Sequence, residues 1–164
     1  MTIRFGILTL SDRSARGERA DASGPALANL IQAEGWSVAK QALLPDEESA
    51  IGAMLISWAD SGELDVILTT GGTGFSPRDV TPEATRAVIA REAPGIAEAM
   101  RLASLKITPH AVLSRAVAGI RKKTLIINLP GSPKGAVESL QVVMAVLPHA
   151  VQLLHEDPAS ESTH

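Results

Sequence analysis

The sequence predicts an α/β protein in which helices cover both faces of a mostly parallel sheet. Short apolar runs, typical of buried strands, alternate along the chain with segments whose apolar residues recur at helical spacing. Only Arg121-Lys122-Lys123 separates the last two predicted strands, which indicates one antiparallel hairpin within the sheet. The chain has 164 residues, 45% of them hydrophobic, and this is enough for one domain with a substantial core.

The first half of the chain contains three predicted strands and two helices. Short apolar runs place the strands at residues 4–10, 38–44 and 66–69. Ser23 is the expected cap of a helix, Pro25 suits its first turn, and Gly35 can end it. Apolar residues at i, i+3, i+4 and i+7 mark the second helix, at Ile51, Met54, Leu55 and Trp58.

The second half begins with a strong helix start, in which Thr81 is the expected cap and Pro82 the first helical residue. A further helix after Pro94-Gly95 has one apolar side, made of Ile96, Met100, Ala103 and Ile107. The hairpin strands are expected at residues 116–120 and 124–128. A last helix carries Leu140, Val143, Leu147, Val151 and Leu154. We expect one domain over residues 1–156 and a polar, flexible tail over residues 157–164.

Composition excludes several classes of function. The absence of cysteine excludes disulfides, thiolate metal sites and cysteine nucleophiles. A net charge of −3 without a basic block, together with only 2% aromatic residues, argues against a nucleic-acid partner. The first residues lack the pattern of a secretory signal, and no apolar run reaches membrane-spanning length. The sequence therefore predicts a cytoplasmic protein with no membrane partner.

A glycine-rich loop follows the third predicted strand directly. Gly71, Gly72 and Gly74 permit positive φ angles and a close backbone approach to a ligand, and Thr69, Thr70 and Thr73 add hydroxyl donors. The loop leads towards a helix start, where the dipole favours anions. It matches neither a Walker loop nor a dinucleotide fingerprint. From spacing alone, a phosphate-binding loop and a plain tight turn are equally well supported.

Three aspartates lie in the loops that follow the first three predicted strands. Asp46 lies in the turn after the second strand, Asp79 lies in the glycine loop, and Asp12 follows Ser11 after the first strand. Mg²⁺ binds to one or two carboxylates together with substrate phosphates, so Asp46 and Asp79 suit nucleotidyl transfer. Alternatively, Asp46 caps the next helix, whereas Asp79 and Asp12 form local turn bonds.

Further polar residues lie near these loops. Arg78 either contacts phosphates or pairs with Asp79, and Ser114-Arg115 suits a phosphate at the edge of a pocket. A second loop follows the last predicted strand and is also expected at the ligand-binding edge of the sheet. Its candidate residues are Asn128, Pro130, Gly131, Ser132 and Lys134. The four histidines show no metal-ligand spacing, and we expect structural or surface roles for them.

One stretch of the chain resembles the signature of the molybdopterin adenylyltransferases: Leu68-Thr69-Thr70-Gly71-Gly72-Thr73-Gly74-Phe75-Ser76-Pro77-Arg78-Asp79-Val80-Thr81-Pro82-Glu83. This family includes the MogA-type bacterial enzymes and the G domain of gephyrin. The resemblance extends through Leu44-Pro45-Asp46-Glu47 and Leu113-Ser114-Arg115 to Ile126-Ile127-Asn128-Leu129-Pro130-Gly131-Ser132. It covers nearly the whole chain. This chain also keeps Arg78-Asp79-Val80-Thr81-Pro82, which some members of the MoaB-like branch lack.

The resemblance implies a three-layer α/β/α, molybdopterin-binding-like fold, a homotrimer, and a molybdate-insertion enzyme as partner. It implies that AMP passes from Mg-ATP to molybdopterin, with Asp46 and Asp79 as catalytic, magnesium-linked acids. The implied nucleotide- and pterin-binding residues are Ser11, Asp12, Thr69, Thr70, Gly71, Gly72, Thr73, Gly74, Arg78, Ser114, Asn128, Pro130, Gly131, Ser132 and Lys134. The alternatives are a non-catalytic molybdopterin carrier or trimeric scaffold of the MoaB-like type, and a generic nucleotide-binding regulator.

Overall fold

A six-stranded sheet forms the middle layer of the protein, whose computed structural model describes residues 1–163. The strand order is β2-β1-β3-β6-β5-β4, and the first four strands in this order are parallel. β5 is antiparallel to both β6 and β4, so the predicted hairpin is present. The strands are β1 (Arg4–Leu10), β2 (Ser37–Leu44), β3 (Val66–Thr70), β4 (Arg91–Glu92), β5 (Ala118–Arg121) and β6 (Thr124–Leu129).

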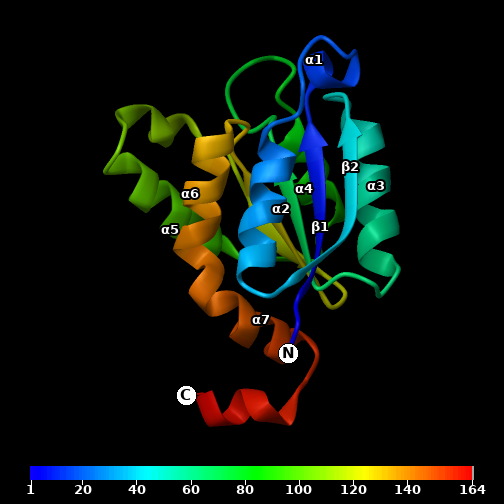
Figure 1. Cartoon of the computed structure of the whole chain (residues 1–164), viewed down its shortest axis with the longest axis vertical. Coiled ribbons are helices and arrows are strands. Elements are labelled where there is room, and N and C mark those ends of the chain that lie inside the picture. Colours follow the sequence, from blue (N-terminus) through cyan, green and yellow to red (C-terminus); the bar gives the residue numbers. More distant parts are fainter. Residues whose placement is uncertain (164) are drawn as a thin grey trace.

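Helices cover both faces of this sheet, as the sequence predicts. In Figure 1, α2 and α6 lie in front of the strands and α4 lies behind them. The α-helices are α1 (Asp12–Ala15), α2 (Ser23–Ala33), α3 (Glu48–Asp60), α4 (Thr81–Val88), α5 (Pro94–Leu105), α6 (Pro133–Val143) and α7 (Leu147–Leu154). Three 3₁₀ segments complete the described chain: η1 (Pro109–Leu113), η2 (Met144–Val146) and η3 (Pro158–Thr163).

Two buried clusters lie on opposite faces of the sheet because successive strand side chains alternate between the faces. On β3, Val66 and Leu68 join the cluster under α2, α5, α6 and α7, whereas Ile67 joins the cluster under α3 and α4. Both clusters are continuous across the parallel strands. The protein therefore has the predicted three layers, and the central strands are rigidly held on both sides.

Helix boundaries differ from the prediction at three points. Thr81 is the first residue of α4 and not its cap, because its hydroxyl donates to the Gly71 carbonyl at 2.9 Å instead. Ser23 is likewise inside α2, where the Gly24 N–H bonds to the Asp21 carboxylate. Ile107 lies beyond the end of α5 and is exposed.

The last predicted helix is broken into α6, η2 and α7, with Pro148 in the first turn of α7. The helical stretch Pro133–Leu154 has 22 residues and contains an 18-residue window with a mean hydropathy of 1.4, so it is long and apolar enough to cross a membrane by length and composition alone. The expectation that no apolar run reaches this length is therefore wrong. The apolar side of this helical stretch packs into the protein core, at Ala136, Leu140, Val143, Leu147 and Val151.

The C-terminal segment after α7 forms η3, and Ser160 within it is buried. His155 anchors the preceding turn, because its Nε2 lies 3.0 Å from the Asp65 carboxylate. The flexibility expected for residues 157–164 stays a prediction, and His164 lies outside the described residues.

Candidate functional site

The carboxyl ends of the four parallel strands meet at one edge of the sheet, where ligands bind in open α/β proteins. β2 leads to Asp46, and its neighbour β1 leads to Ser11 and Asp12. β3 leads to the glycine-rich loop, and its neighbour β6 leads to the turn at Pro130. The sheet order therefore brings together the candidate loops, which are far apart in the sequence.

The glycine-rich loop is bonded directly to the loop after β6. The Gly71 N–H donates to the Leu129 carbonyl at 3.1 Å, and the Thr70 hydroxyl donates to the Pro130 carbonyl at 2.7 Å. The Gly71 N–H is thus unavailable to a phosphate. Of the residues that the structure describes, none accepts a hydrogen bond from the N–H groups of Gly72, Thr73 or Gly74. These three amides are the ones that an anion can use.

Two of the three loop glycines adopt the positive φ angles predicted for them. The φ of Gly71 is 104° and that of Gly72 is 69°, both in a region that other residues rarely adopt. Gly74 has no positive φ, which corrects the prediction for that residue. It is tightly placed for another reason, because a Cβ at Gly74 would lie 2.9 Å from Asp79 Oδ2.

Asp46 and Asp12 are joined by a reciprocal pair of hydrogen bonds. The Asp12 N–H donates to Asp46 Oδ2 at 3.0 Å, and the Asp46 N–H donates to Asp12 Oδ1 at 3.0 Å. Asp46 therefore does not cap α3, whose first turn has no side-chain cap. Arg78 binds both carboxylate oxygens of Asp12 at 2.9 Å, so it pairs with Asp12 and not with Asp79.

The pKa values of the two bonded aspartates are shifted in opposite directions. Hydrogen bonds from the Arg78 side chain and from the Asp46 N–H lower the pKa of Asp12 to about 2. Burial raises the pKa of Asp46, and the nearby negative charges of Asp12 and Asp79 raise it further, against the hydrogen bond from Asp12. Asp46 Oδ1 is buried and has no hydrogen-bond partner among the described residues. An unpaired buried carboxylate oxygen is costly unless something binds to it.

Asp79 lies in the glycine-rich loop and faces the same space as Asp46. Its Oδ2 accepts a hydrogen bond from the Ser76 N–H at 3.0 Å, which is the local turn bond considered from the sequence. It also lines a cavity with Asp46, and its charge contributes to the raised pKa of that residue. The structure therefore brings together the two acids that the sequence singled out.

We call this space the aspartate cavity, and its volume is about 780 Å³. Ten of the residues expected at the site line it: Ser11, Asp12, Asp46, Thr70, Gly71, Gly72, Arg78, Asp79, Gly131 and Ser132. A second space, here called the α5 cavity, has a volume of about 330 Å³. Six of the expected residues line it: Thr73, Gly74, Ser114, Asn128, Pro130 and Ser132.

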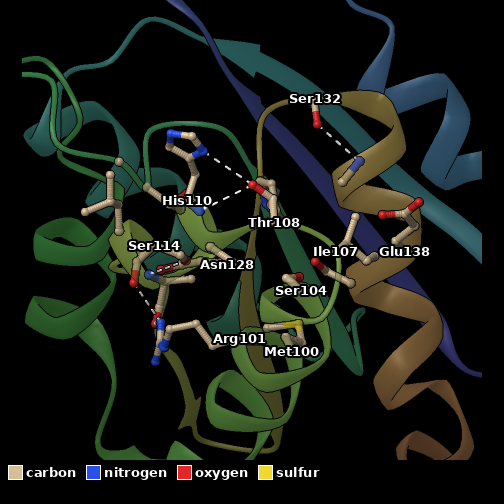
Figure 2. Close-up of a pocket in the computed structure, with 18 of the residues that line it drawn as sticks. Met100, Arg101, Ser104, Ile107, Thr108, His110, Ser114, Asn128, Ser132 and Glu138 are labelled. Atoms are coloured by element: carbon tan, nitrogen blue, oxygen red, sulfur yellow. Dashed lines mark hydrogen bonds between the residues drawn. The ribbon is translucent and has the colours of Figure 1, made fainter.

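The α5 cavity lies between α5, η1 and the start of α6 (Figure 2). Met100 and Ile107 contribute apolar surface, whereas Ser104, Thr108 and His110 contribute polar groups. Ser132, which belongs to both cavities, caps α6 by accepting a hydrogen bond from the Gly135 N–H at 3.1 Å. The two cavities are therefore neighbours on either side of the loop after β6.

Two expected binding residues line neither cavity. Thr69 is fully buried, and its hydroxyl accepts a hydrogen bond from the Asn128 amide at 2.9 Å. Lys134 extends into solvent, where its ammonium lies 3.9 Å from the Glu138 carboxylate. Asn128 reaches the α5 cavity, but its amide group also has a structural role, because it bonds to Thr85 and to the Val117 N–H.

Several lining residues were not identified from the sequence. Arg13, Arg16 and Arg19 line the aspartate cavity. Arg13 lies in α1, directly after β1, and this strand-end position is the signal that could have identified it. Arg101 and Glu138 line the α5 cavity, and no sequence signal pointed to them because only the packing of α5 beside α6 brings them together.

The fold and this site define a class: three-layer α/β proteins with a ligand-binding edge built from a glycine-rich loop and two acidic strand-end turns. A family model described as "Probable molybdopterin binding domain" matches residues 6–149. The chain belongs to this family, which confirms the resemblance stated from the sequence motifs.

Individual relatives support this assignment. The chain is 48% identical to the molybdenum cofactor synthesis protein cinnamon of Drosophila melanogaster over 95% of its own length, but spans only 26% of that protein. It is 43% identical to the molybdopterin adenylyltransferase of Helicobacter pylori, covering 93% of this chain and 88% of the relative. The crystal structure of the molybdopterin biosynthesis enzyme MoaB from Thermus thermophilus is 54% identical and superposes with a TM-score of 0.90, covering 96% of this chain and 99% of that one.

Proposed function

We propose that the protein is a molybdopterin adenylyltransferase, which transfers AMP from Mg-ATP to the terminal phosphate of molybdopterin and releases pyrophosphate. The observation that carries the proposal is the pair Asp46 and Asp79, which face one cavity beside a glycine-rich loop with free amides. The name of the Helicobacter pylori relative, which aligns over nearly the whole chain, supports the same activity.

The reaction joins two phosphates and needs little covalent help from the protein. A terminal phosphate oxygen of molybdopterin bonds to the α-phosphorus of ATP, and the bond from that phosphorus to the β-bridging oxygen breaks. A phosphate monoester has its second pKa near 6, so the attacking group is already ionised at neutral pH and needs no general base. The protein must instead hold two anions in line and offset their charge.

The glycine-rich loop and the arginines supply that positive charge. The N–H groups of Gly72, Thr73 and Gly74 have no acceptor among the described residues, and they lie between the two cavities. Arg13 and Arg19 line the aspartate cavity, where they suit the outer phosphates of the nucleotide. The α5 cavity, which has both apolar and polar walls, suits the flat and polar pterin.

The aspartate cavity also fits a magnesium ion, which Mg-ATP would bring. Asp46 Oδ1 is a buried oxygen with no partner in the part of the chain that the structure describes, and a cation there would offset the burial that raises the pKa of Asp46. No cluster of three or more His, Cys, Asp or Glu residues suited to a metal occurs within residues 1–163. Two carboxylates complemented by substrate phosphates are a common magnesium arrangement. The ion would neutralise phosphate charge.

The proposal also includes a cellular location, an oligomeric state and a protein partner. We infer a cytoplasmic homotrimer that passes adenylylated molybdopterin to a molybdate-insertion enzyme. These inferences rest on the family to which the chain belongs. Size-exclusion chromatography with light scattering tests the trimer, and co-purification of an insertion enzyme with the tagged protein tests the partner.

The activity is tested with purified protein, molybdopterin, ATP and Mg²⁺, with adenylylated molybdopterin and pyrophosphate as readouts. We expect Asp46→Asn and Asp79→Asn to lower turnover by at least about 10²-fold, because charge stabilisation of this kind is usually the largest catalytic term. Asp60→Asn is the matched control, because Asp60 ends α3 and bonds to Arg121 away from both cavities.

The second candidate function is a molybdopterin carrier or scaffold without catalysis. The 54% identical crystal structure is that of a MoaB protein, and this similarity favours the carrier as the second candidate. Wild-type protein that binds molybdopterin and ATP but forms no product under any Mg²⁺ concentration would establish the carrier. Binding of ATP without molybdopterin would instead indicate a nucleotide-binding regulator.

A further inference from the structure

One short loop connects the two cavities of the candidate site. Thr73 and Gly74 line the α5 cavity, whereas Ser76 and Asp79 line the aspartate cavity a few residues later. Phe75 between them is 69% exposed, so packing against the core does not hold this segment in place. Something else must fix the position of the Asp79 carboxylate.

Arg115 contacts this loop at both ends. Its Nε donates to the Gly74 carbonyl at 2.7 Å, and its Nη2 donates to the Asp79 carbonyl at 2.7 Å. Its backbone N–H donates to the Thr73 carbonyl at 2.8 Å. A single side chain therefore bridges the start and the end of the loop that carries Asp79.

The guanidinium of Arg115 is itself held in place by the helix that follows the loop. Its Nη1 donates to both carboxylate oxygens of Glu83 in the first turn of α4, at 2.9 and 2.8 Å. The planar group thus uses its three nitrogens on three different parts of the chain. A lysine has one compact charge and cannot reproduce this arrangement.

The chain on either side of Arg115 forms part of the α5 cavity. Ser114 and Ala116 both line that cavity, and Arg101 Nη1 donates to their carbonyls at 3.0 and 3.1 Å. Arg115 does not line either cavity. Its bonds to backbone carbonyls and to Glu83 leave it poorly placed to bind a phosphate, which is the role that the sequence suggested for it.

We propose that Arg115 is a positioning residue for adenylyl transfer, which holds the Gly74–Asp79 loop so that the Asp79 carboxylate stays aligned with the ligand held by the 114–116 wall of the α5 cavity. This inference rests on the proposed function. Because Arg115 lines neither cavity, it acts by fixing the distance between them. A misplacement of about 1 Å at a reacting centre can lower the rate by roughly 10²-fold.

The test compares Arg115→Gln with Arg121→Gln. Arg121 is a matched control, because it also binds both oxygens of one carboxylate, Asp60, and donates to one carbonyl, that of Val88. It lines neither cavity. We expect similar losses of thermal stability in the two variants, but a fall in kcat of roughly 10- to 100-fold only in Arg115→Gln, with KM for both substrates changed by less than about threefold.

Three further measurements separate positioning from a general structural role. Hydrogen–deuterium exchange of residues 74–79 should accelerate in Arg115→Gln and stay unchanged in Arg121→Gln. Glu83→Gln should lower kcat less than Arg115→Gln, because the bonds from Arg115 to the Gly74 and Asp79 carbonyls remain. Arg115→Lys should fail to restore wild-type kcat, since it cannot bridge both carbonyls.

Equal kcat values and equal loop exchange in Arg115→Gln and Arg121→Gln, with an active wild type, would overturn the inference and leave the proposed function intact. A large rise in KM at unchanged kcat would also overturn it, by making Arg115 a substrate-binding residue. An inactive wild-type protein would refute the proposed function instead. Loop exchange would then still decide whether Arg115 holds the loop.

Discussion

Gly72 lies close to both α4 and Asp46. A Cβ added there would lie 3.0 Å from Asp46 Oδ1 and closer still to Thr81 Oγ1. Thr81 is fully buried, and its hydroxyl donates to the Gly71 carbonyl at 2.9 Å. Gly72→Ala should therefore force the Thr81 side chain away from this hydrogen bond, because the short side chain has no other way to make room.

A second glycine separates this contact from the cost of the backbone angle. Gly62 has a φ of 73°, nearly the same as the 69° of Gly72, and a Cβ added at Gly62 would meet no atom within 4 Å. Gly62→Ala should lower the free energy of unfolding by about 1 kcal/mol, from the left-handed backbone angle alone. Gly72→Ala carries the same cost and adds about 1–3 kcal/mol for the lost hydrogen bond and its unsatisfied buried carbonyl.

The assay is equilibrium unfolding in urea at 25 °C, with the free energy taken from the midpoint and the slope. The slope should not change, because neither substitution alters the surface exposed on unfolding. Turnover should fall in Gly72→Ala alone, since the methyl group also displaces Asp46 Oδ1. Equal stability losses in the two variants would refute the reasoning that close packing, and not only φ, requires glycine at this position.

Two other expectations concern single polar residues. Asp12 has a lowered folded pKa of about 2, so its ionic form stabilises the protein above its ordinary pKa of about 3.9, and this stabilisation is lost as pH falls through that window. The unfolding free energy of Asp12→Asn should therefore depend less steeply on pH between about 4 and 2 than that of wild type, as measured in urea. Asn128→Leu should lower the free energy of unfolding by roughly 3 kcal/mol, because the Val117 N–H is left unpaired. Asn29 is exposed, so the control Asn29→Leu should change the free energy of unfolding by less than about 0.5 kcal/mol.

Much of the fold was predictable because strand and helix signals are local. The β-branched run at Val66–Thr70 and the helical stripe of Ile51, Leu55 and Trp58 both form the expected elements. Boundaries were harder to predict where a side chain found a tertiary partner. Thr81 is the clearest example, because the Gly71 carbonyl is available to its hydroxyl only after the loop has folded back onto α4.

The candidate site shows the same division. Their positions made Asp46 and Asp79 candidates, and the resemblance to the molybdopterin adenylyltransferases favoured them over local cap and turn roles. The structure places both at one cavity. The sequence could not predict that Arg78 would bind Asp12, because the two residues are 66 positions apart and only the strand order brings them together. Arg101 and Glu138 could not be predicted either, since only the packing of α5 beside α6 places both at the α5 cavity.

The sequence by itself determined the class of fold, the two loops at the ligand-binding edge and the acids within them, because hydrophobic periodicity, glycine and strand-end position act over a few residues. Only the tertiary structure decided how these groups are used. It left Asp46 Oδ1 buried with no hydrogen-bond partner among residues 1–163, paired Asp12 with Arg78, and bonded Arg115 to the loop that carries Asp79. Such pairings depend on strand order and helix packing, which no local stretch of sequence encodes.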